Sequence, residues 1–515
     1  MSFIRAFSTI GGLTLASRVA GFVRDMLTAS LLGAGPVADA VVVAQRLPNL
    51  FRSLFAEGAF NTAFVPLYTA ERARQGEESA RSFITEVWGA MILVLTIFSV
   101  LMVLFMPWVI RVIAPGFADE ADRFALSVSL GRIAFPYLVL ISLVALLSGV
   151  LNAHGRFAAP AIAPILFNIC MILAVLGAIL LGGAPELWLT CGLTASGAVQ
   201  LAWLLWVVWR LKLSFRWSWP RWTPRLRHLA KQIAPSALGA GAIQINVLVS
   251  TILASLLPAG IVSALYYADR LAQLPMGVIG IAAGTAMLPL LSGHLARGDE
   301  HAASHLANRG MEASLFLALP AAGGLIAAAE PIVRVLFERG AFTAADTAAT
   351  SAALAAYALG MPAAVLVRLL AANAFARQDT RLPVRCALFA VVANMVLAAL
   401  LLPVLQHVGI ALASSLAAWL NAGLLAHRVW GRGWLRPDAR LRKNGVVLTA
   451  ATFVMSGLVY GAACGARPFL LPSSGLLVQA AILTALLAAG GATYLLITWR
   501  AGAFSLADLR RWRKR

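Results

Sequence analysis

Apolar stretches long enough to cross a lipid bilayer follow one another along almost the whole chain. A helix needs about 20 predominantly apolar residues to cross a hydrocarbon core of roughly 30 Å. Of the 515 residues, 61% are hydrophobic and only 12% are charged, whereas soluble domains carry roughly 25% charged residues. The chain is therefore expected to be an integral membrane protein that has no room for a large soluble domain.

The apolar windows predict an all-α membrane protein with fourteen spanning helices. Charge interrupts the first of them and no small-residue cleavage site follows it, so we expect an uncleaved span. The predicted spans are residues 8–33, 38–66, 84–107, 125–151, 159–182, 186–210, 232–257, 262–291, 310–329, 346–373, 383–403, 407–427, 445–464 and 476–499.

Lysine and arginine are distributed unevenly between the segments that join these spans. If the N-terminus is cytoplasmic, most of them fall in cytoplasmic segments, and the positive-inside rule then places both termini in the cytoplasm. The formal net charge of +20 is then mainly a topology signal and requires no nucleic-acid partner. The basic tail and the Arg- and Trp-rich segment 215–228 fit a position near anionic lipid headgroups. The outer segments hold only Arg111, Arg123, Arg334, Arg339 and Arg467.

Two halves of the chain resemble each other. "ASLLGAG" at 29–35 returns as "ASLLPAG" at 254–260, and "AQRLPNL" at 44–50 aligns with "ADRLAQL" at 268–274. The repeated unit contains about six spans, an even number, so the two copies have the same orientation, as in transporters built from parallel repeats. A duplication kept only for packing would leave the same pattern.

The repeat predicts two six-helix lobes followed by two extra helices. Alternating-access transporters bind their substrate between such lobes, near the middle of the membrane. The expected parts are an N-lobe at 1–215, a basic cytoplasmic linker at 216–231, a C-lobe at 232–430, and the last two helices with a basic tail at 431–515.

Several arginines fall inside the predicted spans, where each costs at least about 2.5 kcal/mol at the bilayer centre. They outnumber the acids of the spans, and excess positive charge in a dry bundle is unfavourable. We therefore expect an open cavity that accepts an anion, and arginine suits a pyrophosphate because it binds phosphate through two hydrogen bonds. The arginines are Arg18, Arg24, Arg46, Arg52, Arg132, Arg270 and Arg368.

Candidate site residues fall into three groups. Substrate-binding candidates in the cationic cavity are Arg18, Arg24, Arg52 and Arg270. Candidates for ion pairing or gating are Asp25, Asp39, Glu57 and Asp269. Secondary candidates are Ser17, Arg46 and Asn49.

A structural alternative exists for each group of charges. Ion pairs that only hold helices together would join Arg18 to Asp39, Arg52 to Glu57 and Arg270 to Asp269, and Arg18 could also share a helix face with Asp25. For Arg132 and Arg368 the structural interpretation is favoured. Pro48 and Gly58 predict an interrupted second span, as at transporter sites.

No motif for enzymatic chemistry is present. The sequence has no G-x-x-x-x-G-K-[ST] phosphate loop, so we expect no ATP hydrolysis. The four cysteines lie in different apolar segments without metal-ligand spacing, and His301 and His305 fit a solvated helix face in a charged loop. We expect a transporter with no metal and no cofactor.

Several motifs resemble the MurJ/MviN lipid II flippase family of the MOP exporter superfamily, over essentially the whole chain. They are "SRVAGFVRD" (17–25), "GAGPVADA" (33–40), "RLPNLFRSLFAEGAFNTAFVPL" (46–67), "APGFAD" (114–119), "YYADRLAQLPMGV" (266–278) and "RQDTRLPV" (377–384). The matching charged positions are Arg18, Arg24, Asp39, Arg52, Glu57, Asp269 and Arg270. One departure is Gln273, where relatives can carry an acid, which argues against ion coupling through this position.

The resemblance implies movement of lipid II, the undecaprenyl-pyrophosphate-linked disaccharide-pentapeptide, from the inner to the outer leaflet of the bacterial inner membrane for peptidoglycan synthesis. It also implies a central cationic cavity for the headgroup and a groove for the lipid tail along the last two helices. Inside-negative potential favours the exit of an anion by about 2.3 kcal/mol per charge per 100 mV. We expect this potential to drive transport, and coupling to a monovalent ion stays open.

Other functions stay open as alternatives. A flippase for another polyprenyl-pyrophosphate glycan, such as an O-antigen unit, would use the same anionic handle. A drug or cation antiporter would place unpaired acids in its cavity, and a scaffold for cell-wall enzymes would need no cationic cavity. We expect a monomer in contact with membrane lipids, with association to the cell-wall synthesis machinery left open.

Overall fold

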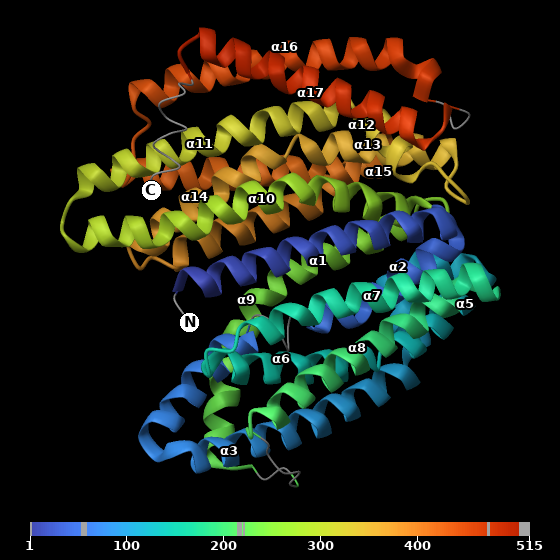
Figure 1. The fold of residues 1–515 in the computed structure, drawn as a ribbon, viewed down its shortest axis with the longest axis vertical. Coiled ribbons are helices and arrows are strands. Elements are labelled where there is room, and N and C mark those ends of the chain that lie inside the picture. The colour runs from blue at the N-terminus through green and yellow to red at the C-terminus, as the bar shows by residue number, and fades with distance from the viewer. Residues whose placement is uncertain (1–2, 53–58, 214–218, 220–221, 471–473, 504–515) are drawn as a thin grey trace. The chain divides into compact units, whose positions relative to one another are not determined.

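The computed structural model describes residues 3–52, 59–213, 219, 222–470 and 474–503. Within these ranges the regular structure is entirely helical (Figure 1), so the predicted all-α class is confirmed. Nine helical segments of the described ranges are long and apolar enough to cross a membrane. The count of fourteen spans stays a prediction.

The chain forms two compact units. Unit 1 comprises Met1–Ser263 and Gly340–Phe342, and unit 2 comprises Ala264–Arg339 and Thr343–Arg515. Helix α10 begins in the first unit and continues in the second.

The helices of unit 1 lie mostly at the predicted spans. They are α1 (Phe3–Leu32), α2 (Pro36–Arg52), α3 (Ala59–Leu104), α4 (Met106–Ile113), the 3-10 helix η2 (Pro115–Asp119), α5 (Ala121–Ala134), α6 (Tyr137–Ala153), α7 (Ala158–Leu181), α8 (Pro185–Arg210) and α9 (Pro224–Ser255), followed by the start of α10 (Ile261–Ala296).

The helices of unit 1 break at two positions, of which only the first was not expected from hydropathy. The predicted span 125–151 is divided between α5 and α6 at Phe135 and Pro136, where proline cannot donate a backbone hydrogen bond. In α3, Gly76 has φ 85° and ψ −179°, which separates two helical halves. Glycine adopts this positive φ without steric cost.

Apolar packing holds the helices of unit 1 together. α1 runs along α7, which lies beside α8 (Figure 1), and a buried cluster that includes Val41, Leu147 and Val175 joins α2, α6 and α7. A second cluster joins α3, α6 and α9, with the rings of Phe60 and Phe64 stacked 5.1 Å apart. This packing fixes α1 and α2, which carry most of the predicted site residues.

The first turns of α9 are bound to α3 by ion pairs. Arg225 donates to Glu71 at 2.8 Å and to Glu86 at 3.2 Å. The Thr223 side chain caps α9 by accepting from the backbone N–H of Leu226. The start of α9, where the basic segment 215–228 ends, therefore has acidic protein partners.

Unit 2 contains the rest of α10 and the helices that follow it. They are α11 (Glu300–Ala327), α12 (Ala329–Phe337), α13 (Ala344–Ala358), α14 (Met361–Ala376), α15 (Arg381–Gly431), α16 (Ala439–Ala466), the 3-10 helix η3 (Arg467–Leu470) and α17 (Leu476–Arg500). Within α15, Gln406 has φ 48° and ψ −129°, so this helix breaks between the predicted spans 383–403 and 407–427.

A polar cluster fixes the start of α16 to α11. Glu312 of α11 accepts hydrogen bonds from Arg440 Nε at 3.1 Å and from Asn444 Nδ2 at 2.5 Å, and it pairs with Arg309. Arg309 also pairs with Asp438, whose side chain caps α16. The start of α16 is thus attached to α11 by ion pairs and hydrogen bonds.

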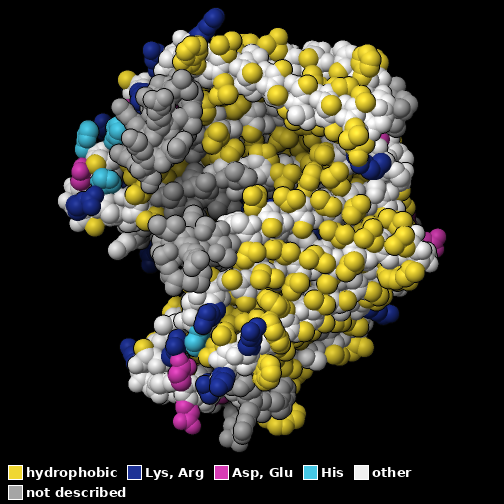
Figure 2. All heavy atoms as spheres, in the orientation of Figure 1, with side chains coloured by type: hydrophobic (Ala, Val, Ile, Leu, Met, Phe, Trp, Pro, Cys, Tyr) yellow, Lys and Arg dark blue, Asp and Glu magenta, His cyan; other side chains and the backbone are white. Residues whose placement is uncertain are grey.

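The outer faces of several long helices are apolar. Leu180 of α7 is 78% exposed and Leu400 of α15 is 67% exposed. Figure 2 shows apolar side chains spread over much of the visible face, where charged side chains are sparse. Exposure of such a surface to water would be unfavourable, so the surface fits contact with lipid chains.

Candidate functional site

Arg24 of α1 lies in a polar site between α1 and α7. Its guanidinium donates to Asp25 Oδ1 from Nε at 3.0 Å and from Nη2 at 2.6 Å, and Nη1 donates to Asn168 Oδ1 at 3.0 Å. The guanidinium carbon lies 5.2 Å from the centre of the Phe167 ring. The side chains of Arg24 and Asp25 are 12% and 10% exposed, so a largely buried cation is held here in one orientation.

Ser17 belongs to the same site, whereas Arg18 forms no ion pair there. Asn168 Nδ2 donates to the backbone oxygen of Ser17 at 2.9 Å and lies 3.4 Å from its hydroxyl. Asp25 pairs with its neighbour Arg24 rather than with Arg18. Arg18 is half-buried and forms no ion pair with any residue that the structure describes.

Asp39 lies at the start of α2 and is completely buried. It pairs with Arg123 of α5, which corrects the prediction of a pair with Arg18. Its two oxygens also accept from the backbone N–H of Gly260, the N–H of Ser263 and the Ser263 hydroxyl, each at 2.7 Å. Because these N–H groups belong to the start of α10, Asp39 caps that helix.

Arg123 was missed as a site residue. It was assigned to an outer connecting segment, whereas its side chain is 1% exposed and lies over the Phe117 ring at 3.7 Å. Its acidic partner is 84 positions away in the chain, so no local spacing could identify the pair.

Close contacts involve the repeated motif in both of its copies. The backbone N–H of Ala341 donates to Ser30 O at 2.8 Å, and a Cβ on Gly340 would lie 2.2 Å from the same oxygen. In the other copy, a Cβ on Gly116 would lie 2.0 Å from Ser255 O. The serine of each "ASLL" motif therefore lies against a glycine, and neither glycine position has space for a side chain.

The remaining candidates of α2 have separate surroundings. Arg46 Nη1 donates to the Thr251 hydroxyl of α9 at 2.6 Å. Asn49 Nδ2 donates to Gln45 O at 2.8 Å within its own helix. Arg52 is the last residue of α2, and its predicted partner Glu57 lies outside the described residues.

In unit 2, the two candidates Asp269 and Arg270 lie on α10. Asp269 accepts a hydrogen bond from Gln273 Nε2 at 2.5 Å. The guanidinium carbon of the exposed Arg270 lies 4.9 Å from the centre of the Tyr266 ring. Gln273, the position that departs from the family pattern, is thus a direct partner of Asp269.

Arg132 and Arg368, the two remaining arginines of the predicted spans, differ in their surroundings. Arg132 is exposed and donates to Val103 O at 3.3 Å. Arg368 is half-buried against α10, where a Cβ on Gly280 would lie 3.1 Å from its guanidinium. Neither observation gives Arg132 or Arg368 a role in substrate binding.

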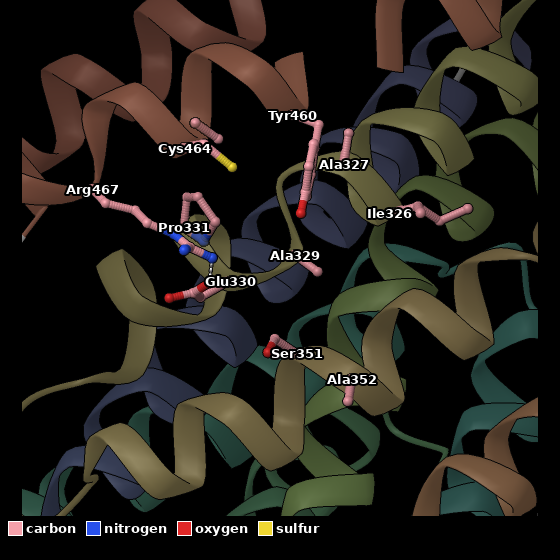
Figure 3. Close-up of a pocket in the computed structure, with 11 residues that line it drawn as sticks. Ile326, Ala327, Ala329, Glu330, Pro331, Ser351, Ala352, Tyr460, Cys464 and Arg467 are labelled. Atoms are coloured by element: carbon pink, nitrogen blue, oxygen red, sulfur yellow. Dashed lines mark hydrogen bonds and ion pairs between the residues drawn. The ribbon is translucent and has the colours of Figure 1, made fainter. Parts of the chain in front are cut away.

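An open pocket lies in unit 2 between α11, α12, α13 and α16 (Figure 3). Glu330 accepts from Arg467 at 3.0 Å and from Arg334 at 2.9 Å. Arg334 also pairs with Glu338 at 3.1 Å, so two acids balance the two arginines and the pocket has little free positive charge for a pyrophosphate. Its lining residues are Ile326, Ala327, Ala329, Glu330, Pro331, Ser351, Ala352, Tyr460, Ala463, Cys464 and Arg467.

Fold and site together define a multi-pass helical membrane protein that keeps arginines and acids within apolar helices, as transporters do. The family described as "Lipid II flippase MurJ" matches residues 28–478. The chain belongs to this family, and the resemblance inferred from its motifs is confirmed.

Curated relatives support this assignment over the full length. The chain is 41% identical to a "Probable lipid II flippase MurJ" of Rhizobium tropici, over 100% of this chain and 97% of the relative. It is 43% identical to a protein of the same description from Rhizobium meliloti (strain 1021), with the same coverage. Identity to the "Lipid II flippase MurJ" of Burkholderia cenocepacia is 33%, over 89% of this chain and 90% of that protein.

Solved structures share the fold. A "Lipid II flippase MurJ, inward closed conformation" superposes with a TM-score of 0.78 at 24% identity, over 95% of this chain and 97% of the other. An inward-facing multidrug resistance MATE family transporter of the MOP superfamily gives a TM-score of 0.68 at 14% identity, over 81% and 94%. At these identities the likeness concerns the fold alone.

Proposed function

We propose that this chain moves lipid II from the cytoplasmic to the outer leaflet of the bacterial inner membrane, for peptidoglycan synthesis. The observation that carries this proposal is the full-length match to relatives described as lipid II flippases or probable lipid II flippases. Arg24 agrees with it, since a buried and oriented guanidinium suits the pyrophosphate of a lipid-linked precursor.

The proposed substrate-binding arginines are Arg18, Arg24, Arg52 and Arg270. Asp25 neutralises the charge of Arg24 in the structure, so Arg18, which has no ion pair among the described residues, supplies positive charge on the same helix. The fifty-five-carbon tail stays in lipid while the polar head crosses. Asp25, Asp39, Glu57 and Asp269 are the proposed ion-pair and gating residues.

The proposed topology has fourteen spans, two lobes related by the sequence repeat, two further helices and both termini in the cytoplasm. The uneven distribution of lysine and arginine supports it. Alternating access between the lobes carries the headgroup across, driven at least partly by the membrane potential. The protein acts as a monomer without a metal or cofactor.

Purified protein in proteoliposomes tests this function. A membrane-impermeant quencher abolishes the fluorescence of labelled lipid II only in the outer leaflet of the vesicle. The fraction of fluorescence that is lost therefore reports translocation. We expect faster translocation with the protein than in empty vesicles, and slower translocation after collapse of an imposed potential. If the protein translocates an undecaprenyl-pyrophosphate-linked O-antigen unit but not lipid II, the O-antigen unit is its substrate instead.

A further inference from the structure

Asn168 is a buried amide in the middle of an apolar helix. It is 5% exposed and lies in the α7 segment "ILFNICMIL". An amide removed from water without hydrogen bonds costs about 1–3 kcal/mol in proteins. An apolar residue would pack in this helix at no such cost, so the position calls for a specific reason to hold asparagine.

The partners of Asn168 use both ends of its amide. Oδ1 accepts from Arg24 Nη1 at 3.0 Å, and Nδ2 donates to Ser17 O at 2.9 Å. A guanidinium cannot accept and a backbone carbonyl cannot donate, so the chemistry fixes which end of the amide faces which partner. Asn168 thus ties α7 to two residues of α1 that lie about two turns apart.

These contacts leave a defined part of the Arg24 guanidinium available. Asp25 takes Nε–H and one N–H of Nη2, and Asn168 takes one N–H of Nη1. Of five N–H groups, one on Nη1 and one on Nη2 have no acceptor among the described residues. Two such groups can bind two oxygens of one phosphate.

We propose that Asn168 is a positioning residue for pyrophosphate binding at Arg24, an inference that rests on the proposed lipid II function. Asp25 holds the edge of the guanidinium that carries Nε and Nη2. Asn168 holds Nη1 and so prevents the group from rotating. Because the amide is neutral, it orients the cation without neutralising it. A second carboxylate in its place would give Arg24 two acidic partners and repel the phosphate.

Two substitutions at Asn168 separate positioning from a purely structural role. Asn168→Leu removes both hydrogen bonds and leaves the charge of the site unchanged. Asn168→Asp keeps an acceptor for Arg24 and adds a negative charge. A structural role predicts that flipping follows stability, so the Asp variant, which keeps the bond to Arg24, would function better than the Leu variant. Positioning predicts that the Asp variant functions worse.

Initial flipping rates are measured in proteoliposomes against the mole fraction of fluorescent lipid II, with thermal melting in detergent as the measure of folding. We expect the half-saturating lipid II fraction to rise about tenfold for Asn168→Leu, as for the loss of one hydrogen bond to a charged group. It should rise further for Asn168→Asp, at a melting temperature no lower than that of the Leu variant.

Gln200→Leu is the matched control. Gln200 is a buried amide of α8, 3% exposed, whose Nε2 donates to Ser196 O in its own helix. We expect this variant to keep the wild-type half-saturation. If the wild type flips lipid II and both Asn168 variants keep its half-saturation, the positioning role is wrong. If the wild type flips no lipid II, the proposed function fails, and this inference fails with it.

Discussion

Loss of Arg123 should destabilise unit 1 by about 3 kcal/mol. Asp39 and Arg123 are 0% and 1% exposed, and removing one partner of a buried ion pair costs about 3–5 kcal/mol because it leaves an uncompensated charge. In Arg123→Leu, Asp39 still accepts from Gly260 and from the N–H and hydroxyl of Ser263. These remaining donors place the expected cost at the lower end of the range.

A double-mutant cycle measures the pair itself. Asp39→Asn alone should also destabilise the protein, since Glu120, whose side chain is 48% exposed, is then the one acidic partner of Arg123 among the described residues. The double variant Asp39→Asn/Arg123→Leu leaves neither charge buried alone. It should therefore cost less than the sum of the two single variants, with a coupling of at least about 1.5 kcal/mol.

Equilibrium unfolding of the four proteins in mixed micelles, followed by circular dichroism, gives these free energies. Arg132→Leu is the control, because Arg132 is exposed and a surface substitution should stay within about 0.5 kcal/mol of the wild type. Additive costs for Asp39→Asn and Arg123→Leu would refute the account of a coupled buried pair.

Three further predictions concern other parts of the chain. Hydrogen bonding by Arg432 and by the N–H of Leu382 lowers the pKa of Asp379, so its stabilisation is present above its ordinary pKa of about 3.9 and is lost as pH falls below it. Asp379→Asn should therefore cost more stability at about pH 6 than at about pH 3, and an equal cost at both would contradict this. Gly340→Val should lower the melting temperature clearly, since φ is 60° and a Cβ would meet Ser30 O, and unchanged melting would show that the turn yields. Arg467→Ala should leave flipping unchanged, because Glu330 keeps Arg334, and a slower rate would give the pocket a role in transport.

Hydropathy predicted the helices well but not every break. Apolar runs located α7, α8 and α17 closely, because burial in lipid requires long apolar segments. The break at Pro136 lies within one continuous apolar run, so the mean hydropathy does not change there. Proline was the available signal, and its effect on the backbone ladder was not weighed at this position.

Charge identified the candidate residues but not all of their partners. Arg24 and Asp25 were identified because charges in an apolar helix are costly. The pairing of Asp39 with Arg18 was wrong, since the choice of partner depends on which helices pack together, and α5 brings Arg123 to Asp39. Asn168 was missed because a neutral amide in an apolar span leaves no charge signal.

The most direct test of the account compares lipid II translocation by the wild type, Arg24→Ala and Arg270→Ala, reconstituted at equal amounts of folded protein. Arg467→Ala serves as a control for the loss of an arginine outside the proposed site. The account predicts that the wild type and Arg467→Ala flip lipid II and that Arg24→Ala and Arg270→Ala do not. Equal translocation by all four proteins would contradict a cationic site that binds the pyrophosphate.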